Sequence, residues 1–261
     1  MKFYRLLSQC LKYSLAAEAA TPLGFWMNLV SSLVDLGLQL AFYGFIFLAS
    51  GSPIAGWSLS KLAILVLTFD FVFQGYALLF GANLGQIPQM IRDGSLDFYL
   101  LKPIDPRFLI SFQRLGPQRL LTLLIDIPLI VIAVKMSGVR VSLMGIGGYI
   151  VTVVAGITVL YSLLFCSLVL SFWVIDVQGP TMALGQLLPL GRYPIDVFPR
   201  AVQFGLKYIV PIGLIAVVPA DTLMRGSLAN VGWAVFTSGI FLLLSGALWR
   251  AGLRKYTGAS A

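Results

Sequence analysis

Long apolar stretches alternate with short polar segments along the whole of this chain. A helix needs about 20 apolar residues to cross a bilayer, and most of these stretches reach or approach that length. The pattern therefore predicts an all-α integral membrane protein with six transmembrane helices in a single transmembrane domain, residues 1–261. The predicted spans cover about residues 23–49, 62–81, 120–134, 143–175, 177–195 and 228–249.

The fifth span can be placed in two ways, because prolines interrupt the apolar residues of this region and break a continuous helix. The prolines are Pro194, Pro199, Pro211 and Pro219. In the first interpretation, a span at 177–195 is followed at 196–226 by re-entrant helices that dip into the outer leaflet. In the second, residues up to about 203 are cytoplasmic and the span covers 204–220. Both interpretations cross the membrane once.

The N-terminal residues 1–22 have the pattern of an amphipathic helix. Apolar side chains recur at helical spacing, and Lys2, Arg5 and Lys12 lie on the opposite face. A basic amphipathic helix of this kind lies in the membrane interface, parallel to the bilayer. The alternative is a plain cytoplasmic extension of the first span.

The distribution of Lys and Arg predicts the orientation. Of the residues, 59% are hydrophobic and 11% charged, against about 25% charged in soluble domains. The termini and the 82–119 loop share one side with 11 Lys and Arg, and the other side holds Lys61, Lys135 and Arg140. The side of Arg192, Arg200, Lys207 and Arg225 depends on where the fifth span lies. Positive charge marks the cytoplasmic side, so both termini and this loop are predicted to be cytoplasmic. The net charge of +8 follows from basic residues at the ends of apolar runs, so no nucleic-acid partner is expected.

The residue types exclude several chemistries. There is no histidine, and the two cysteines, Cys10 and Cys166, are far apart in the sequence. Histidine-based acid–base catalysis and most zinc sites are therefore excluded. The chain also lacks a glycine-rich phosphate loop. We expect no enzyme activity, metal or cofactor in this chain, so that any energy from ATP has to come from another subunit.

Three acidic residues, Asp35, Asp70 and Asp126, lie inside predicted spans. An ionisable group in the bilayer is costly and is a candidate functional residue. One hypothesis is a proton or cation relay, which makes an ion-coupled secondary transporter or channel the rival function. The alternative is that each carboxyl faces the bundle interior and accepts hydrogen bonds. No Lys or Arg is expected to accompany them within the membrane. A non-transporting membrane assembly factor is a third possibility.

The loop at 82–119 is a polar island with regular spacing of its own. A first helical face ends at Gly94, which is a good stop signal, and Ser95 can cap a second short helix. Pro103 and Pro106 end that helix. The apolar side chains on these faces include Ile91, Leu96, Tyr99 and Leu100. The sequence predicts two short helices joined at Gly94–Ser95, rather than a plain interfacial loop that returns the chain to the bilayer.

The motif of this loop resembles one in the permease subunits of type-2 ATP-binding-cassette (ABC) exporters. Asp93-Gly94-Ser95-Leu96-Asp97 is followed by Leu100-Leu101-Lys102-Pro103. The family pattern is an acidic residue, Gly-Ser/Thr-Leu-acidic, two or three residues, Leu-Leu, a spacer and Pro. Glu is usual in the family where this chain has Asp93 and Asp97. The Pro-rich segment after Tyr193 is similar to the family's re-entrant segment, which favours the span at 177–195.

The resemblance implies a function and partners. It implies that the loop is a coupling helix that docks on a cytoplasmic ABC ATPase dimer, which binds ATP and Mg. Ile91, Leu96, Tyr99 and Leu100 would contact the ATPase as an apolar knob, Asp93 and Asp97 would accept hydrogen bonds, and Gly94 would permit the turn. It further implies a bacterial inner membrane exporter of a lipid, drug or glycolipid.

The resemblance also implies a second permease subunit. The first and fifth spans are expected to form the seam, where the small residues Gly179, Ala183 and Gly185 let helices approach closely. The Arg192-Tyr193-Pro194 sequence resembles a subfamily whose permeases often come as pairs of related subunits.

Overall fold

Five long helices form the bundle in the part of the chain that the structure describes. The computed structural model describes residues 12, 14, 22–50, 56–174 and 177–256, and within these ranges it contains helices and no strand. The long helices are α2 (Pro22–Ser50), α3 (Leu59–Tyr76), α7 (Arg119–Ser137), α8 (Leu143–Val169) and α12 (Leu228–Lys255). A π-helical turn, η1 (Ala77–Gly81), and a 3-10 turn, η3 (Leu170–Phe172), lengthen α3 and α8. Each of the five is long and apolar enough to cross a membrane.

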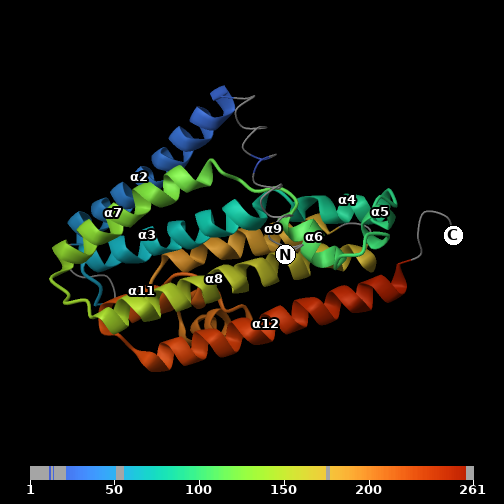
Figure 1. Ribbon diagram of the computed structural model, residues 1–261. Coiled ribbons are helices and arrows are strands. Elements are labelled where there is room, and N and C mark those ends of the chain that lie inside the picture. Colours follow the sequence, from blue (N-terminus) through green and yellow to red (C-terminus); the bar gives the residue numbers. More distant parts are fainter. Residues whose placement is uncertain (1–11, 13, 15–21, 51–55, 175–176, 257–261) are drawn as a thin grey trace.

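The long helices run roughly side by side. In Figure 1, α2 and α7 lie on one side of the bundle, α12 lies on the other, and α3 and α8 lie between them. The most extensive contacts join α8 to α12 and α3 to α7. Helix α3 is the centre of the bundle, because 67% of its span is buried against 11% for α2. The outward surface of α2 is therefore left for lipid or for another protein.

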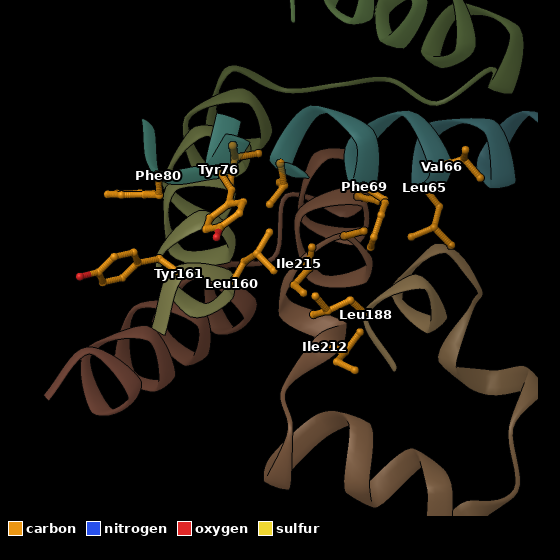
Figure 2. Packing of buried hydrophobic residues seen from close by; sticks show 14 of the residues in the cluster. Leu65, Val66, Phe69, Tyr76, Phe80, Leu160, Tyr161, Leu188, Ile212 and Ile215 are labelled. Carbon is orange, nitrogen blue, oxygen red and sulfur yellow. The ribbon is translucent and has the colours of Figure 1, made fainter. Parts of the chain in front are cut away.

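The core follows the buried face of α3. Figure 2 shows Leu65, Val66, Phe69, Tyr76 and Phe80 along this helix, opposite side chains of α8 and of the segment 188–215. At one end of the row, the rings of Phe80 and Tyr161 have centroids 4.5 Å apart. Such tilted aromatic contacts add about 0.5–1.5 kcal/mol to the burial of the rings. They hold η1 against α8.

Local sequence signals account for the helix ends. The Ser142 side chain accepts the Gly145 N–H at 3.0 Å and begins α8. Ser227 similarly accepts the Asn230 N–H at 3.4 Å at the start of α12. Serine is favoured at this position because it satisfies a backbone donor that the helix leaves open. Gly138 has φ +67° and ends α7 in the left-handed conformation that glycine adopts without strain.

Short elements join α3 to α7 at one end of the bundle. They are η2 (Leu84–Gln86), α4 (Ile87–Arg92), α5 (Asp97–Leu100) and α6 (Pro106–Phe112). Figure 1 places them beside the C-terminal end of α12. We call this end of the bundle the loop end and the opposite end the far end.

The segment predicted as the fifth span is not one continuous helix. The structure has α9 (Gln178–Leu187), η4 (Leu188–Arg192) and η5 (Ile195–Val197) here. The α-helix gives way to 3-10 structure around Pro189, which cannot donate a backbone hydrogen bond. The predicted span 177–195 is therefore corrected to a broken element, shorter than the five long helices.

The segment after Pro194 enters the bundle and leaves it at the same end. Its elements are α10 (Arg200–Phe204), η6 (Gly205–Ile209), η7 (Ile212–Leu214) and α11 (Val217–Arg225). Trp57, just before α3, donates to Asp196 at 3.5 Å, which places residue 196 at the far end. A Cβ built on Gly156, midway along α8, would lie 2.9 Å from the Leu214 carbonyl oxygen.

Helix α11 then returns along α8. A Cβ built on Gly145, in the first turn of α8, would lie 3.2 Å from the Leu223 carbonyl oxygen. Residues 196–226 thus enter and leave the bundle at the far end, and no continuous helix covers 204–220. The predicted interface helix at 1–22 falls outside the described residues, apart from Lys12, Ser14 and the backbone of Pro22.

Candidate functional site

A polar cluster lies among the long apolar helices and extends from the buried Asp70 and Asp126 to the exposed Asp35 on α2. The three predicted acidic residues approach one another here, together with two arginines that the sequence did not assign to the membrane. We define the polar cluster as Asp35, Asp70, Gln74, Arg119, Asp126 and Arg192. Its members come from α2, α3, α7 and η4, so that elements far apart in the sequence meet at one place.

Arg192 is held at mid-depth of the bundle. Its Nη2 lies 3.5 Å from an Asp35 carboxylate oxygen, and its guanidinium carbon lies 4.9 Å from the centroid of the Phe69 ring. Asp35 is near the middle of α2, and Phe69 is near the middle of the span 59–81. The Tyr43 hydroxyl donates to the Arg192 carbonyl oxygen at 2.9 Å, which fixes the backbone as well. An aromatic face and a carboxylate together compensate for part of the cost of a cation away from water.

Glycine makes this position of Arg192 possible. A Cβ built on Gly191 would lie 2.9 Å from Ile212 and 3.1 Å from the Phe69 ring. A side chain there would push η4 away from α3. The arginine can therefore reach the interior only because its neighbour has no side chain.

A second chain of contacts crosses from α3 to α7 and α2. The Gln74 amide nitrogen lies 3.4 and 3.5 Å from the two Asp70 carboxylate oxygens. Arg119 Nη1 donates at 3.2 Å to the Gln74 amide oxygen and at 3.2 Å to the Ser32 hydroxyl. The Asp70 carboxyl is thereby connected to a cation at the start of α7.

Asp126 is the most enclosed member of the polar cluster. It is 0% exposed, and none of the N–H or O–H groups of the described residues donates to either of its carboxyl oxygens. The carboxyl of Asp70, on the adjacent helix, is its charged neighbour. Two carboxyl groups that face each other away from water repel when both are ionised. Their closeness is therefore costly unless at least one of them is neutral.

The expectation that no Lys or Arg accompanies the intramembrane acids was wrong. Arg192 pairs with Asp35, and Arg119 reaches Gln74. The sequence contains a signal for Arg192, because Pro189 and Pro194 stand on both sides of it and mark a break in the helix. A broken helix within a bundle can turn a charged side chain towards the interior.

The loop end carries the second candidate site. Helices α4 and α5 are joined by a turn in which Gly94 has φ +75°, so the two predicted short helices and their junction are present. The capping differs from the prediction. The Asp93 carboxylate accepts the Ser95 hydroxyl at 2.7 Å and the Ser95 N–H at 3.0 Å, whereas Ser95 does not cap α5. These bonds, the hydroxyl first, lower the pKa of Asp93 from its usual value.

The apolar face of this loop is turned differently from the expectation. Leu96 is 0% exposed and packs into the core, so it does not contribute to an outward knob. Phe98 and Leu101 are instead 70% and 82% exposed. Tyr99 is half-buried and donates to Gln113 at 2.9 Å, and Leu100 is partly exposed. The spacing of apolar residues identified the face formed by residues 96, 99 and 100. It did not show that the bundle covers most of this face.

The remaining predicted residues of the loop lie around the turn. Ile91 and Asp97 are half-buried, Asp93 is exposed, and Gly94 is buried. A groove of about 400 Å³ runs beside the turn. Its lining comprises Gln86, Gln89, Met90, Asp93, Ser95, Phe98, Tyr99 and Lys102. The loop end thus presents a polar groove bordered by an exposed aromatic ring.

The loop is held at two points, one between its own two ends and one at the end of α12. The Asn83 side chain donates to the carbonyl oxygens of Ser111 and Arg114, at 3.0 and 2.6 Å, and accepts the Arg114 N–H at 2.9 Å. Tyr256, at the end of α12, lies near Asp97. Its burial, and then the carboxylates of Asp97 and Asp93, raise the pKa of Tyr256. A loop anchored in this way can transmit a displacement instead of absorbing it.

The fold and these two sites define the class of protein. It is an all-helical, multi-pass membrane protein, and among the described residues no group of three or more His, Cys, Asp or Glu could hold a metal ion. The chain belongs to the ABC-2 family of transporter proteins, since the model of that family, described as ABC-2 family transporter protein, matches residues 33–260. No curated protein matches the chain. Members of such permease families are components of membrane transport and generally not catalytic themselves.

Proposed function

We propose that this protein is the permease subunit of an ABC exporter. It moves a hydrophobic or amphipathic substrate, such as a lipid, drug or glycolipid, out of the cytoplasm or the inner leaflet. ATP hydrolysis, with its Mg, takes place in a separate ATPase dimer. Membership of the ABC-2 family over residues 33–260 carries this proposal.

The α4–α6 loop is the element on which the ATPase docks. Exposed Phe98 and Leu101 provide apolar contact area, and Asp93 presents a carboxylate at the turn. Interfaces concentrate their binding energy in a few such anchors, aromatic residues above all. The loop follows α3 through η1 and η2 and leads into α7, so a displaced ATPase pulls on two helices of the core. Phe98 and Leu101 replace Leu96 as the proposed contacts.

A second permease subunit, identical or related, covers α2 and α9. The Asp35 side chain is 61% exposed on a helix that is long enough to span the membrane. A carboxylate facing lipid in this position is costly. The small residues Gly179, Ala183 and Gly185 are exposed along α9, as a helix seam requires. Both features support a seam that involves the first and fifth crossings.

The topology proposed is six crossings with cytoplasmic termini and a cytoplasmic loop end, in a bacterial inner membrane. Five crossings are the long helices, and the sixth is the broken path from α9 through η4 to η5. The prolines Pro194, Pro199, Pro211 and Pro219 then belong to a re-entrant segment on the outer side. The excess of Lys and Arg around the loop end supports this orientation.

Reconstitution tests the proposal. Proteoliposomes that contain the permease with its ATPase should export a fluorescent amphiphile in the presence of ATP and Mg. A variant of the ATPase that cannot hydrolyse ATP serves as the control. Transport that continues unchanged with that variant, or without any ATPase, contradicts the proposal.

The polar cluster favours a second candidate function, an ion-coupled secondary transporter or channel. Asp35, Asp70 and Asp126 approach one another around Arg192, and paired ionisable groups near a broken helix are typical of such proteins. This function predicts that a proton or sodium gradient alone drives substrate across proteoliposomes. Absence of gradient-driven movement, together with ATP-driven export, decides in favour of the ABC permease.

A further inference from the structure

A pocket of about 380 Å³ opens on the surface of the bundle, and no residue of α2 lines it. It lies between η1, α6, α8 and α12, and this volume falls within the range of about 300–1,000 Å³ that is usual for ligand pockets. Most of its wall is apolar: Leu79, Phe80, Phe108, Phe112, Val154, Ile157 and Leu242. Val154 and Leu242 are 58% and 42% exposed, so the pocket opens to the outer surface of α8 and α12.

One charged side chain is held in this pocket by neutral groups alone. Arg107 Nε donates to the Tyr161 hydroxyl at 3.2 Å, and Nη2 donates to the Ser245 hydroxyl at 2.6 Å. Its guanidinium carbon also lies 4.8 Å from the centroid of the Phe165 ring. No carboxylate within residues 22–50, 56–174 and 177–256 forms an ion pair with Arg107. The cation is half-buried and its charge is not neutralised there.

The bundle is built to receive this guanidinium. A Cβ built on Gly246 would lie 2.7 Å from Arg107 Nη1, so a side chain at this point of α12 would displace the end of the guanidinium from its present position. The Tyr161 hydroxyl also bonds to the Ser111 hydroxyl at 2.9 Å, which keeps it in place for Arg107. The adjoining π-helical turn η1 supplies Leu79 and Phe80, and π-helical turns within helices occur frequently at functional sites.

The pocket has a charged end and an apolar end. Ser245 lies shortly before the basic C-terminal residues of α12, and therefore towards the loop end. Val154 is seven residues before Tyr161 on α8, or about 10 Å along the helix axis towards the middle of the membrane. A second charged group, the carboxylate of Asp105, lies at the rim, where it is exposed and caps α6 by accepting the Phe108 N–H at 2.9 Å.

We propose that this pocket binds an aminophospholipid from the leaflet that surrounds the loop end. The phosphate lies against Arg107 and neutralises it, since an arginine fork matches phosphate geometry. The ammonium of the head group lies towards Asp105 at the rim. One acyl chain follows the apolar wall towards Val154 and Leu242. This lipid site is separate from the α2 surface and from the ATPase, so it goes beyond the proposed transport function.

Photolabelling tests the proposal on the full chain in nanodiscs of phosphatidylcholine. The probe is a phosphatidylethanolamine that carries a diazirine in one acyl chain, and labelled peptides are mapped by mass spectrometry. We expect labelling at α6, α8 and α12 around Phe108, Val154 and Leu242. Arg107→Gln should reduce this labelling on the order of tenfold, the effect expected of one charge-assisted contact. Arg250→Gln, an exposed cation further along α12, should leave it unchanged.

A misfolded Arg107→Gln variant would also lose labelling, so a second pair of variants tests the pocket without changing Arg107. Val154→Trp fills the apolar end and should abolish labelling in the pocket. Val151→Trp adds the same ring to an exposed position of α8 outside the pocket and should not. Labelling of Val154→Trp and Arg107→Gln at the wild-type level overturns the proposal.

The head group is tested with two further probes that carry the same chains. A diazirine diacylglycerol, which lacks the phosphate, should label the pocket on the order of tenfold less, and equal labelling rules out phosphate recognition. Phosphatidylglycerol should label the wild type less than phosphatidylethanolamine, and Asp105→Asn should remove that difference. If Asp105→Asn retains the full preference, or the wild type has none, the ammonium is not placed at Asp105.

Discussion

Phe98→Ala separates docking of the ATPase from folding of the permease. The ring is 70% exposed, and a covered Phe side chain buries on the order of 200 Å², so docking removes roughly 140 Å² from water. At about 25 cal/mol per Å², burial of the Phe98 ring contributes at most ~3.5 kcal/mol to the binding free energy. Hot-spot truncations commonly cost about 2 kcal/mol or more, which corresponds to about 30-fold in Kd.

The assay is the affinity of the purified permease for its ATPase in detergent or nanodiscs, measured beside the melting temperature of the permease alone. Phe98→Ala should weaken binding about 30-fold or more without lowering the melting temperature. Leu96→Ala should mainly lower the melting temperature of the permease and affect ATPase affinity less. Leu96 is 0% exposed, and truncation of a buried leucine costs about 2–5 kcal/mol of stability.

Phe204→Ala is the matched control for Phe98→Ala. Phe204 is 58% exposed on α10, on the re-entrant segment, and is far from the loop end. It should change neither affinity nor stability by a comparable amount. If Phe98→Ala binds the ATPase as tightly as the wild type does, the exposed face of α5 is not the docking surface and the assignment of the loop fails.

Three further predictions concern the polar cluster and the topology. Asp126→Asn removes one of two neighbouring buried carboxyls, so the melting temperature at pH 9 should rise by about 2–4 °C, the shift for about 1 kcal/mol; a fall contradicts repulsion between Asp70 and Asp126. Arg192→Gln and Asp35→Asn should give a double-mutant coupling of at least about 0.5 kcal/mol in unfolding, whereas additivity argues against their pair. Asp97→Cys should react with an impermeant maleimide only after permeabilisation, and labelling of intact cells reverses the orientation.

Hydropathy alone predicted the long helices well and the fifth crossing poorly. Helices α8 and α12 are uniform apolar runs whose ends carry serine caps, so length and local signals agree. The stretch 177–195 is less apolar and carries three prolines, and its helix gives way near Pro189, where η4 packs on Phe69 through Gly191. Tertiary contacts between residues more than a hundred positions apart decide that geometry. A sliding window along the chain contains no information on such contacts.

For the loop turn and for the polar cluster, the sequence located the residues but not the tertiary contacts that they make. The motif at Asp93–Asp97 located the turn, because Gly94 has to adopt a left-handed conformation there. The motif did not show which side chains face outward, since burial of Leu96 depends on how α5 lies against the bundle. Likewise, the sequence located Asp35, Asp70 and Asp126 but did not pair them with Arg192, whose position depends on the broken helix.

The two sites are joined by the same pair of helices. The loop begins where α3 ends in η1 and finishes where α7 begins at Arg119. Within the membrane, Arg119 of α7 donates to Gln74 of α3, and the carboxyls of Asp70 and Asp126 lie close enough to interact electrostatically. A force on the loop therefore acts on two helices that meet at these polar side chains. Relative movement of α3 and α7 would change the distances between Asp70, Asp126 and Arg119. The energy of that movement therefore depends on the charges of these side chains. The polar cluster therefore lies where a displacement of the loop end would reach the membrane interior.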